Sequence, residues 1–339
     1  MRRRRPGVGP APEGAALNDE AGPATATRRL ADLVLARDAR ALARTISWIE
    51  SGDERGRLIL RELAARAGGA ARSPGATRVI GITGAPGAGK STTTNGLVEA
   101  LRARGELVAV LAVDPSSPFS GGALLGDRVR MQGHALDSGV FIRSMASRGQ
   151  LGGLSAAAPM AIRALEAAGF SVVLVETVGV GQAEVEIASA ADSTVVVVVP
   201  GMGDSIQAAK AGVLEIADVL AVNKADRPDT AATVRDLKHM VALSSAAWKP
   251  PVVPTVATTS EGVGDLLGAL DRHWDWLASV GELARRRRAR ARDEVLAMAY
   301  GTVRRGLSGP LLDTLAGQVA DGVLDPREAS EKLLSSVMS

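Results

Sequence analysis

Short runs of aliphatic residues alternate with longer stretches of helical periodicity through the middle of the chain. The runs at residues 79–82, 108–113, 172–175, 195–199 and 219–222 are rich in valine, and 252–253 is expected to be a sixth. Strands that are apolar at every position are typical of a parallel sheet buried on both faces. The pattern therefore predicts an α/β fold with a mostly parallel, helix-covered sheet between about residues 76 and 270.

Helical periodicity replaces this alternation on the N-terminal side. Leu42, Ile46 and Ile49 recur at i, i+4 and i+7, and a polar break at residues 51–53 interrupts the pattern. Two or three short helices are expected between residues 30 and 68. The Pro-, Gly- and Ala-rich sequence up to Thr27 is expected to be disordered.

The chain beyond the sheet becomes helical again. Asp325, Pro326 and Glu328 occupy the N-cap, the first position and the third position of a well-formed helix start. The predicted organisation is a disordered tail at 1–27, an N-terminal helical segment at 28–72, a central α/β domain at 73–270 and a C-terminal helical arm at 271–339.

Composition excludes several classes of protein. The chain has no cysteine, which excludes disulfides, a thiolate nucleophile and Cys-ligated zinc or iron–sulfur sites. Four Trp, three Phe and one Tyr are too few to build stacking platforms for single-stranded nucleic acid. The longest strongly apolar stretch, 195–199, is far shorter than the roughly 18–20 residues that a membrane helix needs.

Charge is unevenly distributed along the chain. Of 40 basic residues, four lie at positions 2–5 and six in the run Arg285 to Arg292, which leaves 30 basic against 37 acidic residues elsewhere. That remainder has a net charge of −7, so it does not favour nucleic acid. The basic N-terminus lacks the apolar run of a secretory signal. We therefore expect a cytoplasmic protein with no nucleic-acid partner and no membrane partner.

A phosphate-binding loop is the most specific chemical feature. Residues 84–91 match G-x-x-x-x-G-K-[ST] in full, between the first predicted strand and a helical stretch at 92–103. Glycines let successive N–H groups point inward at a phosphate. The Lys90 ammonium suits the β- and γ-phosphates, and the Ser91 hydroxyl suits Mg²⁺. Nucleotide contacts are expected from Gly84, Ala85, Pro86, Gly87, Ala88, Gly89, Lys90, Ser91 and Thr92.

Acidic residues near the same sheet edge are candidates for a metal site. Only residues 104–106 separate the first helix from the second strand, so this strand should run parallel to the first. Asp114 and Glu176 each end a predicted strand, where a carboxylate can bind Mg²⁺ or its waters; for Asp114 an Asp-Pro turn is the alternative. Asp127 is a further candidate, with a solvated loop as the alternative. Gly179 can present its N–H to the γ-phosphate.

Asn223, Lys224 and Asp226 have the spacing of an N-K-x-D element after a strand. The Asp226 carboxylate can accept from both N1–H and the exocyclic amine of guanine, and adenine offers no such pair of donors. Asn223 can bond guanine N7 and the flanking loop, and the stem of Lys224 can cover the base. Ala257 and Thr258, after the next strand, are expected to contact guanine O6 through the backbone.

Residues 200–212 follow the most apolar strand on the expected ligand edge. Two glycines beside Asp204 and Lys210 indicate either a mobile loop that reports the nucleotide state or a plain strand-to-helix connection.

Six segments in this order resemble the MeaB/MMAA/ArgK family, the methylmalonyl-CoA mutase-associated G proteins of the SIMIBI class of P-loop GTPases. They are GITGAPGAGKST at 81–92, VDPSSP at 113–118, GALLGDRVRM at 122–131, VETVGVGQAE at 175–184, PGMGDSIQAAKAG at 200–212 and NKAD at 223–226. The phosphate loop and NKAD are generic, whereas the second, third and fourth segments are far more specific. The resemblance extends from about residue 30 to the C-terminus.

The resemblance implies a slow, partner-stimulated GTPase with a SIMIBI-type G domain at 73–270. Such a protein uses GTP/GDP and Mg²⁺ to gate delivery of adenosylcobalamin to an acyl-CoA mutase, and to protect or reactivate that mutase. The helical extensions at both ends fit the family, in which the C-terminal arm makes a homodimer. The run Arg285 to Arg292 is expected either in that arm's interface or on a solvated helix face.

Site residues are carried over from the family by motif. The resemblance implies that Lys90, Glu176 and Gly179 serve catalysis and that Ser91, Asp114, Asp127 and Glu176 surround the metal. It further implies that Asp204, Gln207 and Lys210 lie in a switch that contacts the mutase.

Three other classes of protein share parts of this sequence pattern. An older interpretation of the family is a transport-linked ATPase or kinase. The NKAD segment argues against an ATPase, because it favours guanine over adenine as the base of the nucleotide. A metal-insertion GTPase usually carries Cys and His ligands, whereas here Cys is absent and His134, His239 and His273 are widely separated. A signal-recognition GTPase needs a Met-rich RNA-binding domain, which eight scattered Met do not indicate.

Overall fold

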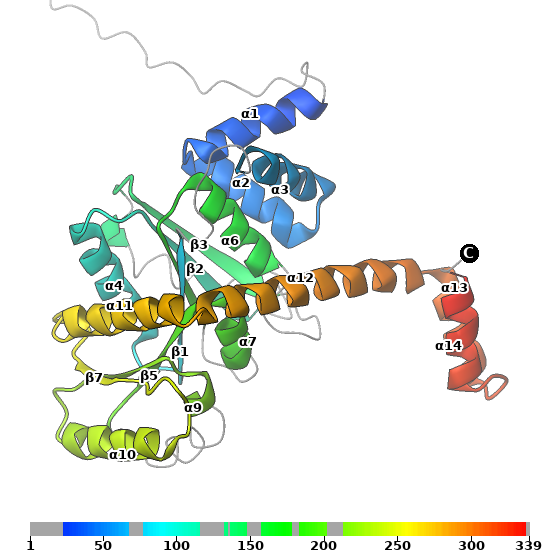
Figure 1. Ribbon diagram of the computed structural model, residues 1–339. Helices are drawn as coiled ribbons and strands as arrows, with labels where there is room; N and C mark the ends of the chain where they lie inside the picture. Colours follow the sequence, from blue (N-terminus) through cyan, green and yellow to red (C-terminus); the bar gives the residue numbers. More distant parts are fainter. Residues whose placement is uncertain are drawn as a thin grey trace, which may run out of the picture.

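A seven-stranded parallel sheet forms the centre of the protein (Figure 1). The computed structural model describes residues 23–67, 77–115, 132–134, 136–147, 157–177, 183–201 and 213–336. In order across the sheet, the strands are β3 (Val140–Ser147), β2 (Val108–Pro115), β4 (Val172–Thr177), β1 (Arg78–Gly84), β5 (Ser193–Val198), β6 (Val219–Asn223) and β7 (Val252–Thr255). Every neighbouring pair is parallel, which confirms the predicted fold class and the predicted direction of β2.

Side chains alternate between the two faces of the sheet. Along β1, Val79 joins the apolar cluster on one face, whereas Ile80 and Ile82 join the cluster on the other. The helices α6 (Ala157–Ala168), α7 (Ala183–Ala190) and α10 (Thr230–Leu243) contribute to the first face. The helices α4 (Lys90–Ala103) and α11 (Val263–Ser279) cover the second. Two short helices, η1 (Gln132–His134) and α9 (Val213–Ile216), precede β3 and β6.

The edge strand β3 is a strand that the sequence pattern did not predict. It pairs with β2 alone in the described sheet. Phe141 and Met145 are buried, but the residues between them are only half-buried, so the segment lacks the continuous apolar run of the inner strands. Arg143 on this strand donates to Ser47 Oγ at 2.8 Å and to a Glu50 carboxylate oxygen at 3.1 Å. The N-terminal helices thereby contact the face of β3 on which Phe141 and Met145 are buried.

The N-terminal unit consists of three helices. They are α1 (Pro23–Leu35), α2 (Ala39–Ser51) and α3 (Glu54–Ala67), and they pack against α6 and each other. The periodic residues Leu42, Ile46 and Ile49 are buried, as predicted. The predicted break is a left-handed turn at Gly52, whose φ is 68°. The predicted tail was too long, because α1 begins at Pro23 and so includes residues 23–27.

The C-terminal helices extend away from the sheet (Figure 1). The expected boundary at 270 falls inside α11, which continues to Ser279 with Leu277 still buried in the sheet body. After it, α12 (Glu282–Leu307) projects outward and carries α13 (Pro310–Ala320) and α14 (Pro326–Ser335) at its far end. Asp325 caps α14 by accepting from the N–H groups of Arg327 and Glu328 at 2.8 and 3.2 Å, as predicted. None of the helices in the described ranges is long and apolar enough to cross a membrane.

The core makes a direct stability prediction. Leu174 of β4 is 0% exposed and lies opposite Ile80 of β1 and Val110 of β2. We expect Leu174→Ala to lower the free energy of unfolding by about 2–5 kcal/mol, because it removes buried methyl groups and leaves a cavity. Urea unfolding measures this change. Leu243→Ala is the control: Leu243 is 74% exposed, so the expected loss is under about 0.5 kcal/mol. Equal losses in the two variants would contradict the assignment of the core.

Candidate functional site

Glycines in the loop between β1 and α4 allow it to lie against two neighbouring strands. Gly84 has a φ of 140°, and a Cβ there would stand 2.2 Å from the Val197 carbonyl oxygen of β5. Gly89 has a φ of 92°, and a Cβ there would stand 2.2 Å from Asn223 Nδ2 at the end of β6. A side chain at either position would therefore push the loop off the sheet edge.

Lys90 begins α4 and lies inside this loop. Its ammonium group is buried and donates to the Gly84 and Ala85 carbonyl oxygens at 2.8 and 3.0 Å. The amino end of α4 adds the partial positive charge of its backbone N–H groups. Loop, lysine and helix start together form an anion-binding site of the kind that takes a nucleotide's phosphates.

Ser91 and Glu176 meet beside the loop. The Ser91 hydroxyl donates to Glu176 Oε1 at 2.5 Å, and Glu176 is buried at the carboxyl end of β4. Two oxygen-bearing side chains at this spacing suit a hard cation such as Mg²⁺. In the sheet register, Ala112 of β2 pairs with Glu176, so the backbone of Asp114 lies two residues further toward the same edge. Within the described residues, no group of three or more His, Cys, Asp or Glu side chains gathers as a metal site.

The N-K-x-D segment is tied to the phosphate loop through its first two side chains. Asn223 is buried; its Nδ2 donates to the Ala88 carbonyl oxygen at 2.8 Å, and its Oδ1 accepts from the Ala257 N–H at 3.1 Å. Lys224 donates to the Gly87 carbonyl oxygen at 2.8 Å. Asn223 thus joins three loops, while Asp226 remains exposed to solvent.

A cavity of about 220 Å³ lies where these loops meet. It is lined by Gly89, Thr92, Asn223, Lys224, Asp226, Arg227, Val256, Ala257 and Thr258. The structure therefore brings together the residues that the sequence assigned to base recognition. Arg227 and Val256 line the cavity but were not predicted. Each is next to a predicted residue in the sequence, and this adjacency is the one signal that could have identified them.

Several predicted residues lie outside the described ranges. They are Asp127, Gly179, Asp204, Gln207 and Lys210, and the structure does not describe the Asp114 side chain either. The intervals that contain them follow β2, β4 and β5, whose carboxyl ends share one edge with the phosphate loop.

The close approach of Gly84 yields a prediction for nucleotide affinity. Gly84→Ala places a methyl group against the Val197 carbonyl and strains the backbone, at a cost of about 1–3 kcal/mol. Since ~1.4 kcal/mol is tenfold in affinity, GTP binding should weaken by about tenfold or more. Isothermal titration calorimetry measures it. Gly105→Ala is the control, with a positive φ of 78° but no neighbouring atom within 4 Å. Unchanged affinity in Gly84→Ala would contradict the role assigned to the loop.

Comparison with known proteins agrees with this geometry. A family model described as methylmalonyl-CoA mutase-associated GTPase MeaB matches residues 42–308. A Pyrococcus horikoshii protein named as a GTPase is 43% identical over 308 residues, covering 89% of this chain and 95% of that protein. The mouse protein named methylmalonic aciduria type A homolog, mitochondrial, is 33% identical over 322 residues, covering 88% of this chain and 76% of that protein.

A solved structure has a similar fold along nearly the whole chain. The crystal structure of a protein named LAO/AO transport system kinase superposes with a TM-score of 0.68 at 25% identity, and covers 96% of this chain and 100% of that one. The family match spans everything from α2 through α12, including both loops of the site described above. The chain therefore belongs to the MeaB family of P-loop GTPases, and it is a GTPase that binds guanine nucleotides.

Proposed function

We propose that the protein uses GTP binding and hydrolysis to gate cofactor delivery to an adenosylcobalamin-dependent acyl-CoA mutase, and to protect or reactivate that enzyme. The observation that carries this proposal is the match over residues 42–308 to a family named for its association with methylmalonyl-CoA mutase. The sequence segments specific to the family support the same partner. A transport-linked kinase, which is the name given to the protein in the similar solved structure, is the alternative.

The proposed nucleotide contacts follow from the site geometry. The backbone N–H groups between Gly84 and Thr92, which Pro86 alone lacks, surround the phosphates, and Lys90 would exchange its loop carbonyls for the β- and γ-phosphates. Asp226 reads the N1–H and amine of guanine, beside Ala257 and Thr258 in the same cavity. Lys224 covers the base with its stem while its ammonium bonds the loop. In this proposal Asn223 joins the loops, and the second hydrogen of its Nδ2 donates to guanine N7.

Mg²⁺ fits the oxygen donors at the edge of the site. Ser91 and Glu176 would hold the ion or its waters, with Asp114 and Asp127 completing the acidic set. When bound, the ion would neutralise charge on the β- and γ-phosphates. Glu176 is buried at the end of β4, which fixes where its carboxylate can act. Gly179 comes two positions after the end of β4 in the sequence and is proposed to contact the γ-phosphate.

The interval 202–212 is proposed as the contact with the mutase. It begins four positions after the end of β5, and Asp204, Gln207 and Lys210 are the residues expected to report the nucleotide state to the partner. A segment attached directly to the nucleotide edge is suited to this task, because γ-phosphate contacts can order it and hydrolysis can release it.

A second copy of the chain is proposed to cover the C-terminal arm. The outer half of α12 exposes Val295, Met298, Tyr300 and Val303, and α13 exposes Leu311 and Leu312. Clustered apolar side chains of this kind on a projecting helix indicate a protein–protein interface. The family resemblance favours a homodimer over another occupant.

Base recognition is tested by Asp226→Asn. The amide loses one charge-assisted acceptor for guanine but can donate to the additional carbonyl of xanthine. We expect GTP affinity to fall on the order of 10- to 100-fold, with xanthosine triphosphate affinity rising relative to it. Competition titrations measure both. An unchanged preference for GTP would show that Asp226 does not read the base.

The partner is tested by GTP hydrolysis with and without a mutase. We expect slow turnover of GTP that an adenosylcobalamin-dependent acyl-CoA mutase from the same organism accelerates, with ATP as the control nucleotide. Lys90→Ala should abolish the acceleration because it removes the charge beside the phosphates. Turnover that prefers ATP, or that no such mutase changes, would reject the mutase partner and favour the transport-linked alternative.

A further inference from the structure

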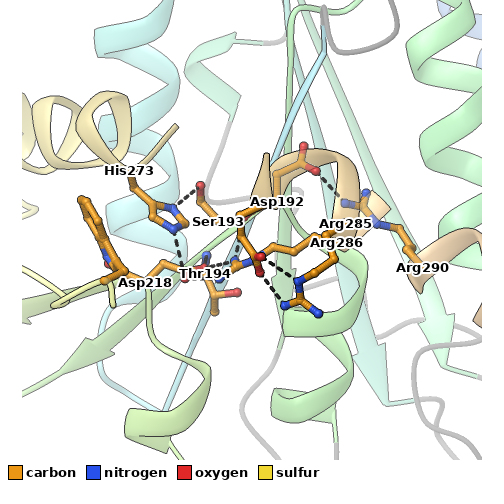
Figure 2. Close-up of polar contacts among 10 residues, drawn as sticks. Asp192, Ser193, Thr194, Asp218, His273, Arg285, Arg286 and Arg290 are labelled. Atoms are coloured by element: carbon orange, nitrogen blue, oxygen red, sulfur yellow. Dashed lines mark hydrogen bonds and ion pairs between the residues drawn. The ribbon is translucent and has the colours of Figure 1, made fainter. Parts of the chain in front are cut away.

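The arginine-rich start of α12 is bound to two buried aspartates of the sheet (Figure 2). Asp192 directly precedes β5 and its side chain is 1% exposed; Asp218 directly precedes β6 and is 8% exposed. Arg287 bonds both carboxylate oxygens of Asp192 at 3.0 and 2.8 Å, and Arg290 adds a bond of 2.6 Å. Arg286 bonds both oxygens of Asp218 at 2.9 and 3.0 Å. This part of the arginine run is therefore neither a solvated face nor free for an interface.

The same aspartates bind the backbone of neighbouring strands. Asp192 accepts from the Val79 N–H of β1 at 3.0 Å, and Asp218 accepts from the Thr194 N–H of β5 at 2.8 Å. Arg287 also donates to the Thr77 carbonyl oxygen at 2.7 Å, just before β1. We call Asp192, Asp218, Arg286, Arg287 and Arg290 the arginine clamp. It ties α12 to the amino ends of β1, β5 and β6.

Aromatic residues enclose one side of the clamp. His273 of α11 is fully buried, with Nδ1 at 2.8 Å from Ser193 Oγ and Nε2 at 3.2 Å from Asp218 Oδ1. Trp248 donates its indole N–H to the Asp218 carbonyl oxygen at 2.8 Å. Burial alone would raise the pKa of Asp218, but hydrogen bonds from His273 and Arg286 outweigh it and lower that pKa. Asp218 is therefore ionised at neutral pH, as the clamp requires.

The three clamped strands are those that end at the nucleotide site. Gly84 ends β1 and opens the phosphate loop, β5 leads into the interval 202–212, and Asn223 ends β6. These strands have seven, six and five residues, so the clamp and the site are separated by roughly 17–23 Å of extended backbone. Strands packed on both faces deform little, so a shift at their amino ends is carried to their carboxyl ends.

We propose that Arg286, Arg287 and Arg290 are positioning residues for the nucleotide site, and that the clamp couples the orientation of α12 to the choice between GTP and GDP. The proposal rests on the nucleotide site proposed above. Binding linkage makes the coupling reciprocal: nucleotide exchange alters the clamp, and anything that moves the arm alters nucleotide affinity. Arg286 and Arg287 make bidentate ionic contacts, which define one position of α12 on the sheet, whereas an apolar contact would tolerate sliding.

Tryptophan emission tests the coupling in the unmodified clamp. Of the four Trp, Trp248, Trp274 and Trp276 lie at the clamp, where Trp274 stacks with Arg287 at 5.6 Å and the other two flank His273. Trp48→Phe therefore leaves only reporters of this region. We expect emission to differ between the GDP complex and the complex with a non-hydrolysable GTP analogue. Identical emission with both nucleotides bound would overturn the coupling.

Matched lysine variants test the positioning role. Arg287→Lys keeps the charge but loses the bidentate fork, and Arg288→Lys makes the same change at an exposed neighbour. We expect Arg287→Lys to change the ratio of the GDP and GTP-analogue dissociation constants by threefold or more and to reduce the emission difference. Arg288→Lys should change neither.

These experiments distinguish a failure of the coupling from a failure of the proposed nucleotide site. If Arg287→Lys lowers the melting temperature but leaves the ratio of the GDP and GTP-analogue dissociation constants unchanged, the clamp has a purely structural role and the coupling is overturned. Arg290→Lys repeats the comparison on the second Asp192 contact if Arg287→Lys does not fold. Failure of the unmodified protein to bind either nucleotide would overturn the proposed site and the coupling together.

Discussion

The parallel direction of all seven strands is the constraint on which the rest of the structure depends. Because the strands point the same way, every strand-to-helix loop that follows a carboxyl end emerges on one edge of the sheet. The phosphate loop after β1, Glu176 at the end of β4 and Asn223 at the end of β6 are neighbours for this reason. Ala88 and Asn223, which are 135 positions apart in sequence, then share a hydrogen bond.

Close contact between the loops depends on glycines, which have no side chain, as much as on the side chains of other residues. Gly84 and Gly89 let the phosphate loop approach β5 and β6 to distances that a Cβ would not permit. Asn223 then uses its amide to join the loop to the Ala257 backbone. The N-K-x-D segment and the phosphate loop are thereby held in a fixed relation, which lowers the ordering cost of binding a nucleotide across both.

At the opposite edge of the sheet, where the strands begin, two buried aspartates need a partner of opposite charge. Asp192 and Asp218 accept backbone N–H groups at the amino ends of the strands, but a buried carboxylate is costly unless it is paired. The arginines of α12 supply the pairing charge, and in doing so they seat the C-terminal arm on the sheet. The strands β1, β5 and β6 run directly from these aspartates to the edge that carries the phosphate loop.

The sequence by itself determined the fold class, the phosphate loop, the place of the N-K-x-D segment at the end of a strand, and the cap at Asp325, because each depends on local residue order or on complete burial of a strand. It did not show β3, whose edge position leaves an interrupted apolar pattern, nor the start of α1 within a Pro- and Ala-rich segment. Only the tertiary structure decided the role of the arginine run. Its partners, Asp192 and Asp218, lie about 70 to 100 residues earlier in the chain, and no local pattern distinguishes an arginine that meets a buried carboxylate from one that faces water.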